Sequence, residues 1–189
     1  MIATEIYGQN EYTAELARRL ARHGVEVAVV DPYDGARLGP LSEQAAHERF
    51  LAECGPERYA RLLAERAASL PKPLLAVGFS AGAVAVWALA CADGVDLSRA
   101  ICFYGSGIRH LADQKPCCPV DMILPLREPH FDVAALARML AAHPDVTCHL
   151  CPWLHGFMNP LSREYAPEGY ALWLARIQDQ ARLLSLPAS

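Results

Sequence analysis

Residues 74–92 read LLAVGFSAGAVAVWALACA and contain no charged side chain. A run of this length is long enough for a membrane helix. However, Pro73 precedes it, and Gly78, Ser80 and Gly82 interrupt its first half. It also divides into a short aliphatic run and an alanine-rich run. This pattern predicts a buried strand that turns into a buried helix rather than a span across a bilayer.

The motif Gly78-Phe79-Ser80-Ala81-Gly82 lies at the junction of these two runs. The G-x-S-x-G pattern alone is common by chance, but between a strand and a helix it is typical of a nucleophile elbow. Such a turn needs small neighbours, as Gly78, Gly82 and Ala83 are. The first N–H groups of the helix would favour a developing oxyanion near the serine. The alternative is a structural Gly-Ser turn that packs a helix onto its strand. The context favours Ser80 as a nucleophile.

Around this motif, strand-like and helix-like segments alternate along the chain. Strands are predicted over 2–7, 25–30, 74–79, 100–104, 120–124 and 146–151, and helices over 11–22, 42–54, 56–70, 81–92, 131–143 and 168–184. This alternation is typical of a mainly parallel sheet covered by helices on both faces. The sequence therefore predicts an α/β fold, and without repeats or a linker it predicts a single domain over 1–189.

The composition is that of an ordinary globular chain, with 53% hydrophobic residues, 20% charged residues and a formal net charge of −4. Well-mixed charges argue against nucleic acid or an anionic membrane as a partner, and they suit a small-molecule substrate. The first residues show no basic stretch followed by an apolar run, so no secretory signal is expected and the protein is predicted to be cytoplasmic. Composition leaves monomer and homodimer open.

Seven cysteines are spread irregularly along the sequence. Cys148 and Cys151, with Cys117 and Cys118 as partners, offer the elements of a zinc or redox site. Residues 146–151 are predicted as a strand, however, in which alternate side chains face opposite ways. Free, mostly buried thiols are therefore the favoured interpretation, and a thiol or metal protein remains an alternative.

A serine hydroxyl needs a base to take its proton, and the sequence contains seven histidines. In hydrolases with this elbow the order along the chain is serine, then acid, then histidine. That order leaves His143 before a proline at a predicted helix end, His149 inside a predicted strand, and His155. The last of these follows the final strand, at the carboxyl edge where open α/β sheets place their sites. His155 is therefore the candidate base.

The base in turn needs an acid that holds its tautomer and stabilises its charged form. We expect this acid on the loop after the strand 120–124, where Glu128 and Asp132 are available. Asp121 lies inside that strand, and Asp113 is a remote third candidate. Position alone does not separate Glu128 from Asp132.

Four landmarks follow one another over nearly the whole chain. They are Glu5-Ile6-Tyr7-Gly8-Gln9-Asn10, Gly78-Phe79-Ser80-Ala81-Gly82, Phe103-Tyr104-Gly105 and His155-Gly156-Phe157. Each landmark is weak alone, but in this order the chain resembles the dienelactone hydrolase family of α/β-hydrolases.

This resemblance implies an oxyanion hole formed by the backbone N–H groups of Ala81 and Ile6. The family carries an Asp-Pro-His-like segment after the strand that precedes the acid, and Glu128-Pro129-His130 falls there. The resemblance therefore favours Glu128 over Asp132 as the acid. The remaining residues expected to line the site are Glu5, Tyr7 and Asn159.

The chain also departs from the dienelactone-cleaving members of that family. Ser80 stands where they have a cysteine, and Asn159 stands where they have an arginine that holds the substrate carboxylate. The second difference argues against dienelactone itself as the substrate. In those members the residue matching Glu5 contacts the nucleophile. They also carry strands before this segment, so we expect a shortened sheet edge here, covered by a loop or by another subunit.

Together these features predict a serine hydrolase that cleaves a small ester, lactone or thioester and needs no metal or organic cofactor. The alternative from another class is a non-catalytic binding protein built on the same scaffold, since a fold alone does not establish a function.

Overall fold

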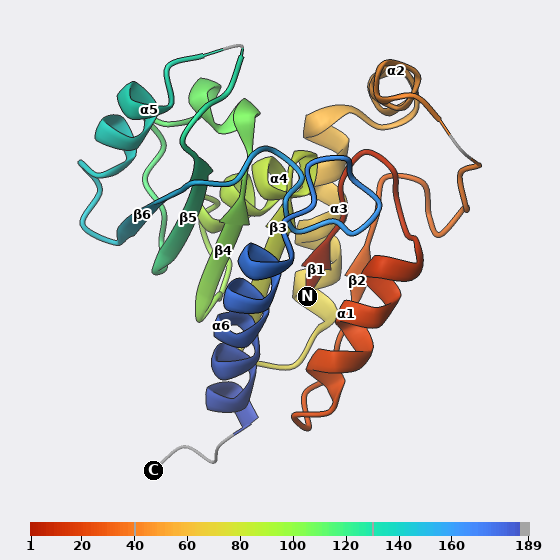
Figure 1. Cartoon of the computed structure of the whole chain (residues 1–189). Helices are drawn as coiled ribbons and strands as arrows, with labels where there is room; N and C mark the ends of the chain where they lie inside the picture. Colours follow the sequence, from red (N-terminus) through yellow and green to blue (C-terminus); the bar gives the residue numbers. More distant parts are fainter. Residues whose placement is uncertain (40, 130, 186–189) are drawn as a thin grey trace.

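The computed structural model describes residues 1–39, 41–129 and 131–185, and Figure 1 shows the arrangement of their elements. In chain order these are β1 (Ile2–Ala3), α1 (Glu11–Ala21), β2 (Val29–Val30), α2 (Glu43–Glu53), α3 (Gly55–Ser69), β3 (Leu75–Phe79), α4 (Ala81–Ala90), β4 (Arg99–Phe103), the 3₁₀ helix η1 (Ser106–His110), β5 (Val120–Pro125), α5 (Val133–Leu140), β6 (Val146–Cys151) and α6 (Pro167–Ser185). The predicted alternation of strands and helices is confirmed.

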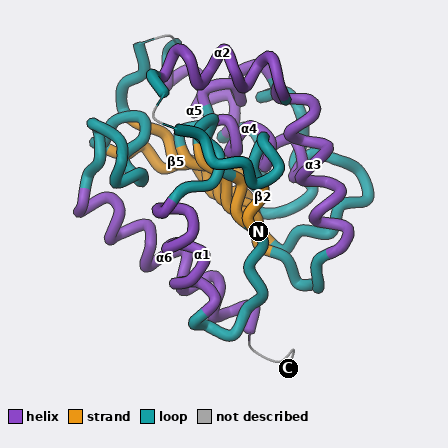
Figure 2. The backbone as a smooth tube through the Cα atoms, turned by 90° about the vertical axis from the view of Figure 1, so that its right-hand side faces the viewer, coloured by secondary structure: helices purple, strands orange, loops and turns teal. Residues whose placement is uncertain are grey.

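The strands form one six-stranded sheet in the order β2-β1-β3-β4-β5-β6. Every neighbouring pair is parallel. Figure 2 shows the strands as a central layer, with α1 and α6 on one side and α3 and α4 on the other. The predicted α/β class, a parallel sheet with helices on both faces, is therefore correct.

Each face of the sheet buries its own hydrophobic cluster. In β4, Ile101 and Phe103 belong to the cluster under α1 and α6, whereas Ala100 and Cys102 belong to the cluster under α3 and α4. The alternation follows from the two-residue period of a strand. Because both faces are covered, a central strand has no polar side to present, which explains the uninterrupted apolar character of 74–79.

The first strand is shorter than its predicted range of 2–7, because the chain turns out of the sheet after Ala3. The N–H of Gly8 donates to the carbonyl of Glu5 at 3.1 Å, and Gly8 has a φ of +69°. That left-handed conformation favours glycine. The turn takes the segment from Glu5 to Gly8 away from the strand ladder and toward the carboxyl edge of the sheet.

The second strand is likewise shorter than its predicted range of 25–30. Only Val29 and Val30 pair, opposite Ile2 and Ala3, because β1 offers no further partner residues. As β2 is the outermost strand on this side, the expected shortening of this edge takes the form of a two-residue edge strand. Such short edges limit unwanted pairing with other chains.

The helix predicted over 131–143 runs only from Val133 to Leu140. Its start is set by Asp132, which is extended and accepts a hydrogen bond from the N–H of Ala135 at 2.9 Å. An aspartate that caps a helix stands outside it. At the other end the chain leaves the helix, and His143 reaches across to the carbonyl of Ala112 at 2.9 Å.

Replacing Gly78 by alanine is expected to destabilise the fold by about 3 kcal/mol, as overpacking of a tight core does. A Cβ at Gly78 would collide with the carbonyl oxygen of Gly82, where the start of α4 crosses β3. The loss should appear in thermal unfolding as a midpoint lowered by roughly 10 °C. Gly39→Ala is the matched control, because a Cβ there would meet nothing within 4 Å. Equal midpoints for the two variants would contradict this packing.

Candidate active site

Ser80 lies in the turn between β3 and α4, at the carboxyl edge of the sheet. Its backbone has a φ of 52° and a ψ of −114°, a conformation that costs a non-glycine residue about 1–3 kcal/mol. Three backbone hydrogen bonds hold it. The N–H of Ser80 donates to the carbonyl of Phe103 at 3.0 Å, and its carbonyl accepts from the N–H groups of Ala83 at 3.0 Å and Val84 at 3.2 Å. This is the geometry of the elbow that the sequence predicts.

His155 follows β6 and reaches the serine from the neighbouring loop. Its Nε2 lies 3.0 Å from the Oγ of Ser80, and its Nδ1 lies 2.8 Å from the Oε1 of Glu128. A carboxylate can only accept, so Nδ1–H donates to Glu128 and Nε2 is left to accept from the serine hydroxyl. The structure thus brings the three predicted side chains into one hydrogen-bonded chain.

The other candidate acids lie elsewhere. Asp132 caps α5, and Asp113 is exposed. Asp121 is held between Arg99 at 2.7 Å and His149 at 2.9 Å, within the sheet. Of the predicted segment Glu128-Pro129-His130, the histidine lies outside the described residues.

The rival histidines are also occupied at other places. His149 faces Asp121, and the ring of His143 bonds the carbonyl of Ala112. Only His155 among these three contacts the serine of the elbow.

The pKa of His155 is raised above its ordinary value of 6.5. Burial by itself would lower it, since a buried imidazole resists protonation. The hydrogen bond and negative charge of Glu128 outweigh burial, and the charges of Glu5 and Glu43 act in the same direction. The surroundings of His155 therefore favour the imidazolium form.

The backbone groups of Ala81 and Ile6 come from two segments that pack closely. Ala81 is the first residue of α4, and the leading N–H groups of a helix have no partner within it. A Cβ at Gly82 would collide with the carbonyl oxygens of Ala3 and Thr4, so the start of α4 lies directly against the end of β1. Among the described residues, the N–H of Ile6 donates no hydrogen bond.

Tyr33 holds the Ile6 segment, a role that is not predicted from the sequence. Its hydroxyl donates to the carbonyl of Ile6 at 2.7 Å. The backbone N–H of Tyr33 in turn donates to the buried Asp31 at 2.8 Å. The available signal is position, because Asp31-Pro32-Tyr33 follows directly after a strand at the same carboxyl edge.

Glu5 is buried beside this site and does not bond Ser80. Its two carboxylate oxygens accept from the hydroxyl of Tyr104 at 2.9 Å and from the side-chain amide of Asn159 at 2.7 Å. Burial raises the pKa of Glu5, and these two hydrogen bonds oppose the rise. Two predicted lining residues, Glu5 and Asn159, are thus joined to each other.

Tyr104 connects Glu5 with the histidine. Its ring centroid lies 4.9 Å from that of His155, and its φ of 41° lies in the left-handed region. A bulky residue is strained in this conformation, which places the buried ring at the end of β4 beside the site. From the sequence, Phe103-Tyr104-Gly105 is predicted only as a family landmark, without this contact.

Tyr7, the third predicted lining residue, is half-buried in the turn after β1. Burial raises its pKa, and the charges of Glu43 and Glu5 raise it further. The charge of Glu43 raises the pKa of His155 in the same way.

A hollow of about 580 Å³ lies beside the acid of this site. Its lining is mostly apolar, with Leu126, Phe131 and Leu154 next to Glu128, and it also includes Arg127. It adjoins the hydrogen-bonded chain and offers room next to it.

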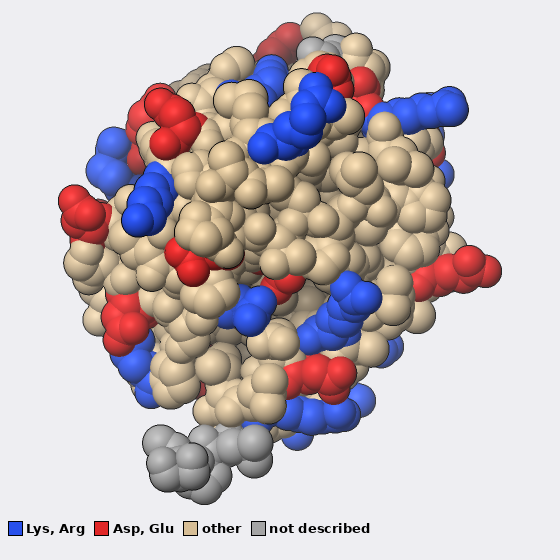
Figure 3. Space-filling model, turned by 90° about the vertical axis from the view of Figure 1, so that its left-hand side faces the viewer, with Lys and Arg blue, Asp and Glu red and all other residues tan. Residues whose placement is uncertain are grey.

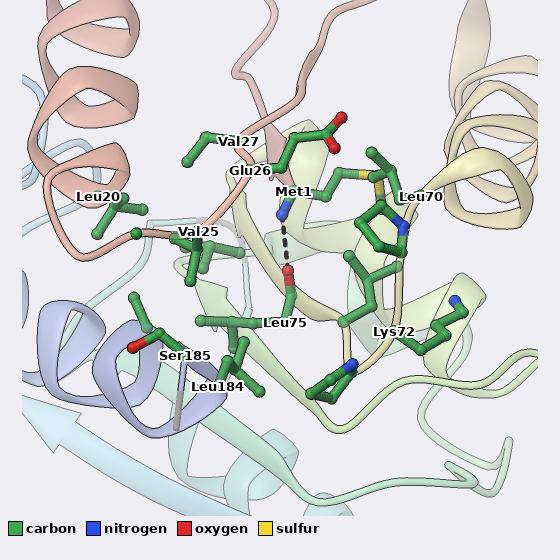
Figure 4. A pocket seen from close by; sticks show the side chains of 16 residues that line it. Met1, Leu20, Val25, Glu26, Val27, Leu70, Lys72, Leu75, Leu184 and Ser185 are labelled. Carbon is green, nitrogen blue, oxygen red and sulfur yellow. Dashed lines mark hydrogen bonds between the residues drawn. The ribbon is translucent and has the colours of Figure 1, made fainter. Parts of the chain in front are cut away.

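A second hollow, of about 180 Å³, lies at the amino ends of the strands and is shown in Figure 4. There the terminal amine of Met1 donates to the carbonyl of Leu75 at 2.7 Å, between Val25 and Leu70. The lining contains no histidine. Since β3 begins at Leu75 and Ser80 follows its other end, this hollow is separate from the candidate site.

Cys148 and Cys151 do not face a common site. Cys148 packs in the cluster under α3 and α4, and Cys151 packs in the cluster under α1 and α6, as the alternation of a strand requires. Burial raises the pKa of both thiols. Within 1–39, 41–129 and 131–185, no three His, Cys, Asp or Glu residues are grouped so that they could hold a metal ion.

The distribution of surface charge and the character of the helices can be compared with the partners that the composition suggests. Figure 3 shows one face on which Lys and Arg side chains alternate with Asp and Glu around an uncharged centre. In the part of the chain that the structure describes, no helix is both long and apolar enough to cross a membrane.

No protein-family profile matches the chain, but solved structures resemble it over nearly its whole length. A dienelactone hydrolase-like promiscuous phosphotriesterase from metagenomic libraries has a TM-score of 0.68 at 18% identity, over 97% of this chain and 84% of that one. Mouse alpha/beta hydrolase domain-containing protein 10 has a TM-score of 0.65 at 13% identity, over 95% and 88%. A cold-adapted esterase from an Arctic intertidal metagenomic library has 0.62 at 16%, over 94% and 81%.

The sheet order, the elbow and these likenesses together define a protein with the α/β-hydrolase fold, which confirms at the level of the fold the resemblance to dienelactone hydrolases. The uncharacterized protein YczH of Bacillus subtilis (strain 168) is 30% identical over 167 residues, 85% of this chain and 80% of YczH. The chain belongs to the same family as YczH.

Proposed function

We propose that this protein hydrolyses a small carboxylic ester, lactone or thioester, with Ser80 as nucleophile, His155 as base and Glu128 as the acid that orients it. One observation carries the proposal. The Oγ of Ser80, the imidazole of His155 and the carboxylate of Glu128 form an unbroken hydrogen-bonded chain, with distances of 3.0 and 2.8 Å, on a strained elbow.

In the proposed reaction the Oγ of Ser80 attacks the substrate carbonyl while Nε2 of His155 takes the hydroxyl proton. The tetrahedral intermediate collapses, and His155 gives that proton to the departing alcohol or thiol. Water then attacks the acyl-serine, again with His155 as base. The carboxylic acid product is released, and His155 returns the proton to Ser80. Glu128 keeps Nδ1 protonated throughout and stabilises the imidazolium.

The backbone N–H groups of Ala81 and Ile6 are proposed to stabilise the oxyanion. Support comes from the close packing of α4 on β1 and from the free N–H of Ile6 within the described residues. Losing one such donor in a comparable site costs about 10²–10³ in rate. The side chain of Ile6 therefore matters less than the bond from Tyr33 that holds its peptide in place.

A fluorophosphonate probe tests the proposal, because it reacts with an activated serine. We expect the purified wild-type protein to be labelled, with the adduct on the peptide that contains Ser80. The variant Ser80→Ala should remain unlabelled under the same conditions. An unlabelled wild type, beside an active esterase that labels, would instead favour a binding protein on the hydrolase scaffold.

The acid limb of kcat/KM is expected at a pH above the ordinary histidine value of 6.5, because the pKa of His155 is raised. Protonated His155 cannot accept the serine proton, so activity falls as the pH drops through this pKa. Glu128→Gln removes the charge that raises the pKa and should move the limb to lower pH. A limb that stays in place would show that another group titrates. The measurement is a pH profile of both proteins.

A further inference from the structure

Negative charge is concentrated around the imidazole of this site. Glu128 bonds His155 directly. Glu5 reaches it through Tyr104, whose hydroxyl bonds Glu5 and whose ring lies 4.9 Å from the imidazole ring. Glu43, at the exposed start of α2, is the third charge that acts on His155. Two segments of the fold, the loop after β5 and the turn after β1, thus bring carboxylates close to the imidazole.

Among the described residues, the charge of Glu5 is not paired with a lysine or an arginine. Its two partners, Tyr104 and Asn159, are neutral donors, and both oxygens accept, as those of an ionised carboxylate do. In the part of the chain described here, neither Glu5 nor Glu43 forms an ion pair with Lys or Arg. Asp121, by contrast, is matched by Arg99 at 2.7 Å.

An unbalanced buried charge acts on the substrate as well as on His155. A second carboxylate about 8 Å away would be repelled by roughly 1 kcal/mol or more, because the effective dielectric constant there is far below that of water. The reaction's own oxyanion is offset by the proposed N–H donors and by the imidazolium. A carboxylate elsewhere on the acyl group has no such compensation.

We infer that this site selects against acyl groups that carry a carboxylate and accepts uncharged or cationic ones, an inference that rests on the proposed ester hydrolysis. Glu5, which is buried beside the imidazole, is the residue that imposes the selection. Glu128 contributes charge too, but its bond to His155 ties it to the chemistry itself.

Two arginines on the acid side of the site bear on this inference. Arg109 donates to the carbonyl of Ser106 and lies over the ring of Phe131, so its guanidinium is engaged. Arg127 lines the hollow beside Glu128, together with Asp132. The two arginines offset Glu128 and Asp132 on this side, so the uncompensated negative charge beside the imidazole is that of Glu5.

The test compares three esters of the same chain length and the same leaving group. They are the para-nitrophenyl esters of hexanoic acid, of adipic acid with one carboxylate free, and of ω-trimethylammonio-hexanoic acid. Each kcat/KM is divided by the rate of hydroxide hydrolysis of the same ester, which removes intrinsic reactivity. We expect the hexanoate ester to exceed the adipate ester by about tenfold or more, and the cationic ester to be at least as fast as the hexanoate ester.

Two charge-removing variants locate the cause. Glu43→Gln changes an exposed side chain, and Glu5→Gln changes a buried one, so a folding defect in the second leaves the first informative. Glu5→Gln should reduce the hexanoate-to-adipate ratio by about threefold, mainly through faster adipate hydrolysis, and Glu43→Gln, at an exposed and more strongly screened position, should reduce it by less. Glu48→Gln, which changes another exposed glutamate of α2, is the matched control and should keep the wild-type ratio. Using a ratio cancels any general loss of activity in a variant.

A wild type that hydrolyses the adipate ester as fast as the hexanoate ester would overturn the inference while the proposed function stands. Faster adipate hydrolysis that Arg127→Gln abolishes would overturn it too, and would assign the acyl carboxylate to Arg127. Hydrolysis of none of the three esters, without probe labelling, would remove the proposed function and this inference with it.

Discussion

Replacing Ser80 by alanine is expected to lower kcat for ester hydrolysis about a million-fold, the loss seen when the nucleophile of a serine triad is removed. The methyl group of alanine leaves His155 with no hydroxyl proton to accept at the 3.0 Å position. It fits the elbow in volume, because only the Oγ is lost. Steady-state assays of wild type and variant on the same ester measure kcat, with long incubations for the slow variant.

The matched control for this variant is Ser98→Ala, an exposed serine before β4, which lies at the opposite edge of the sheet from the site. It should keep wild-type kcat and wild-type stability. Hydrolysis by Ser80→Ala within tenfold of the wild type would remove Ser80 as the nucleophile, provided that both proteins unfold at similar temperatures.

Replacing Glu128 by glutamine is expected to lower kcat by about 10⁴-fold, as the equivalent loss of charge does in a serine protease triad. Glutamine keeps the size of the side chain, which is only 6% exposed. Its amide can donate to Nδ1, however, and would then place the histidine proton on Nε2. In that tautomer His155 can no longer accept from Ser80.

Asp132→Asn is the control that separates Glu128 from Asp132, which position along the chain alone does not distinguish. Asn and Asp cap helices about equally well, so α5 should keep its start and the fold its stability. We expect wild-type kcat for this variant. A loss equal to that of Glu128→Gln would reverse the assignment of the acid, although it would leave the reaction class intact.

The acid that bonds His155 could not be predicted from position along the sequence. Glu128 and Asp132 follow β5 on the same loop, and both are carboxylates of similar reach. Distance along the chain cannot decide which one meets His155, because His155 lies on the loop after β6, 27 positions after Glu128. The helix start decides it: Asp132 bonds the N–H of Ala135, and this leaves Glu128 to face the imidazole.

Tyr104 and Tyr33 illustrate a second limit. Each lies just after a strand, and that position is visible in the sequence. Their contacts are not, because Tyr104 meets Glu5 across 99 positions and Tyr33 meets Ile6 across 27. Such partners are chosen by which strands neighbour one another in the sheet. β1 pairs with β3 as well as with β2, and the pairing with β3 brings Glu5 beside the elbow.

The stretch 74–92 was enough to determine a buried strand, a tight elbow and a buried helix, because hydrophobic periodicity and small residues act locally. The local alternation of strands and helices also predicted the α/β class. The position of Ser80 and His155 after their strands predicted that the two lie together at the carboxyl edge. The family resemblance favoured Glu128 as the acid, and the tertiary structure shows the contact that completes the chain and the way in which Tyr104 and Asn159 hold Glu5. It also decided the negative charge that surrounds His155. These features depend on the order of strands in the sheet and on burial, and both arise from packing between segments that are distant in the sequence.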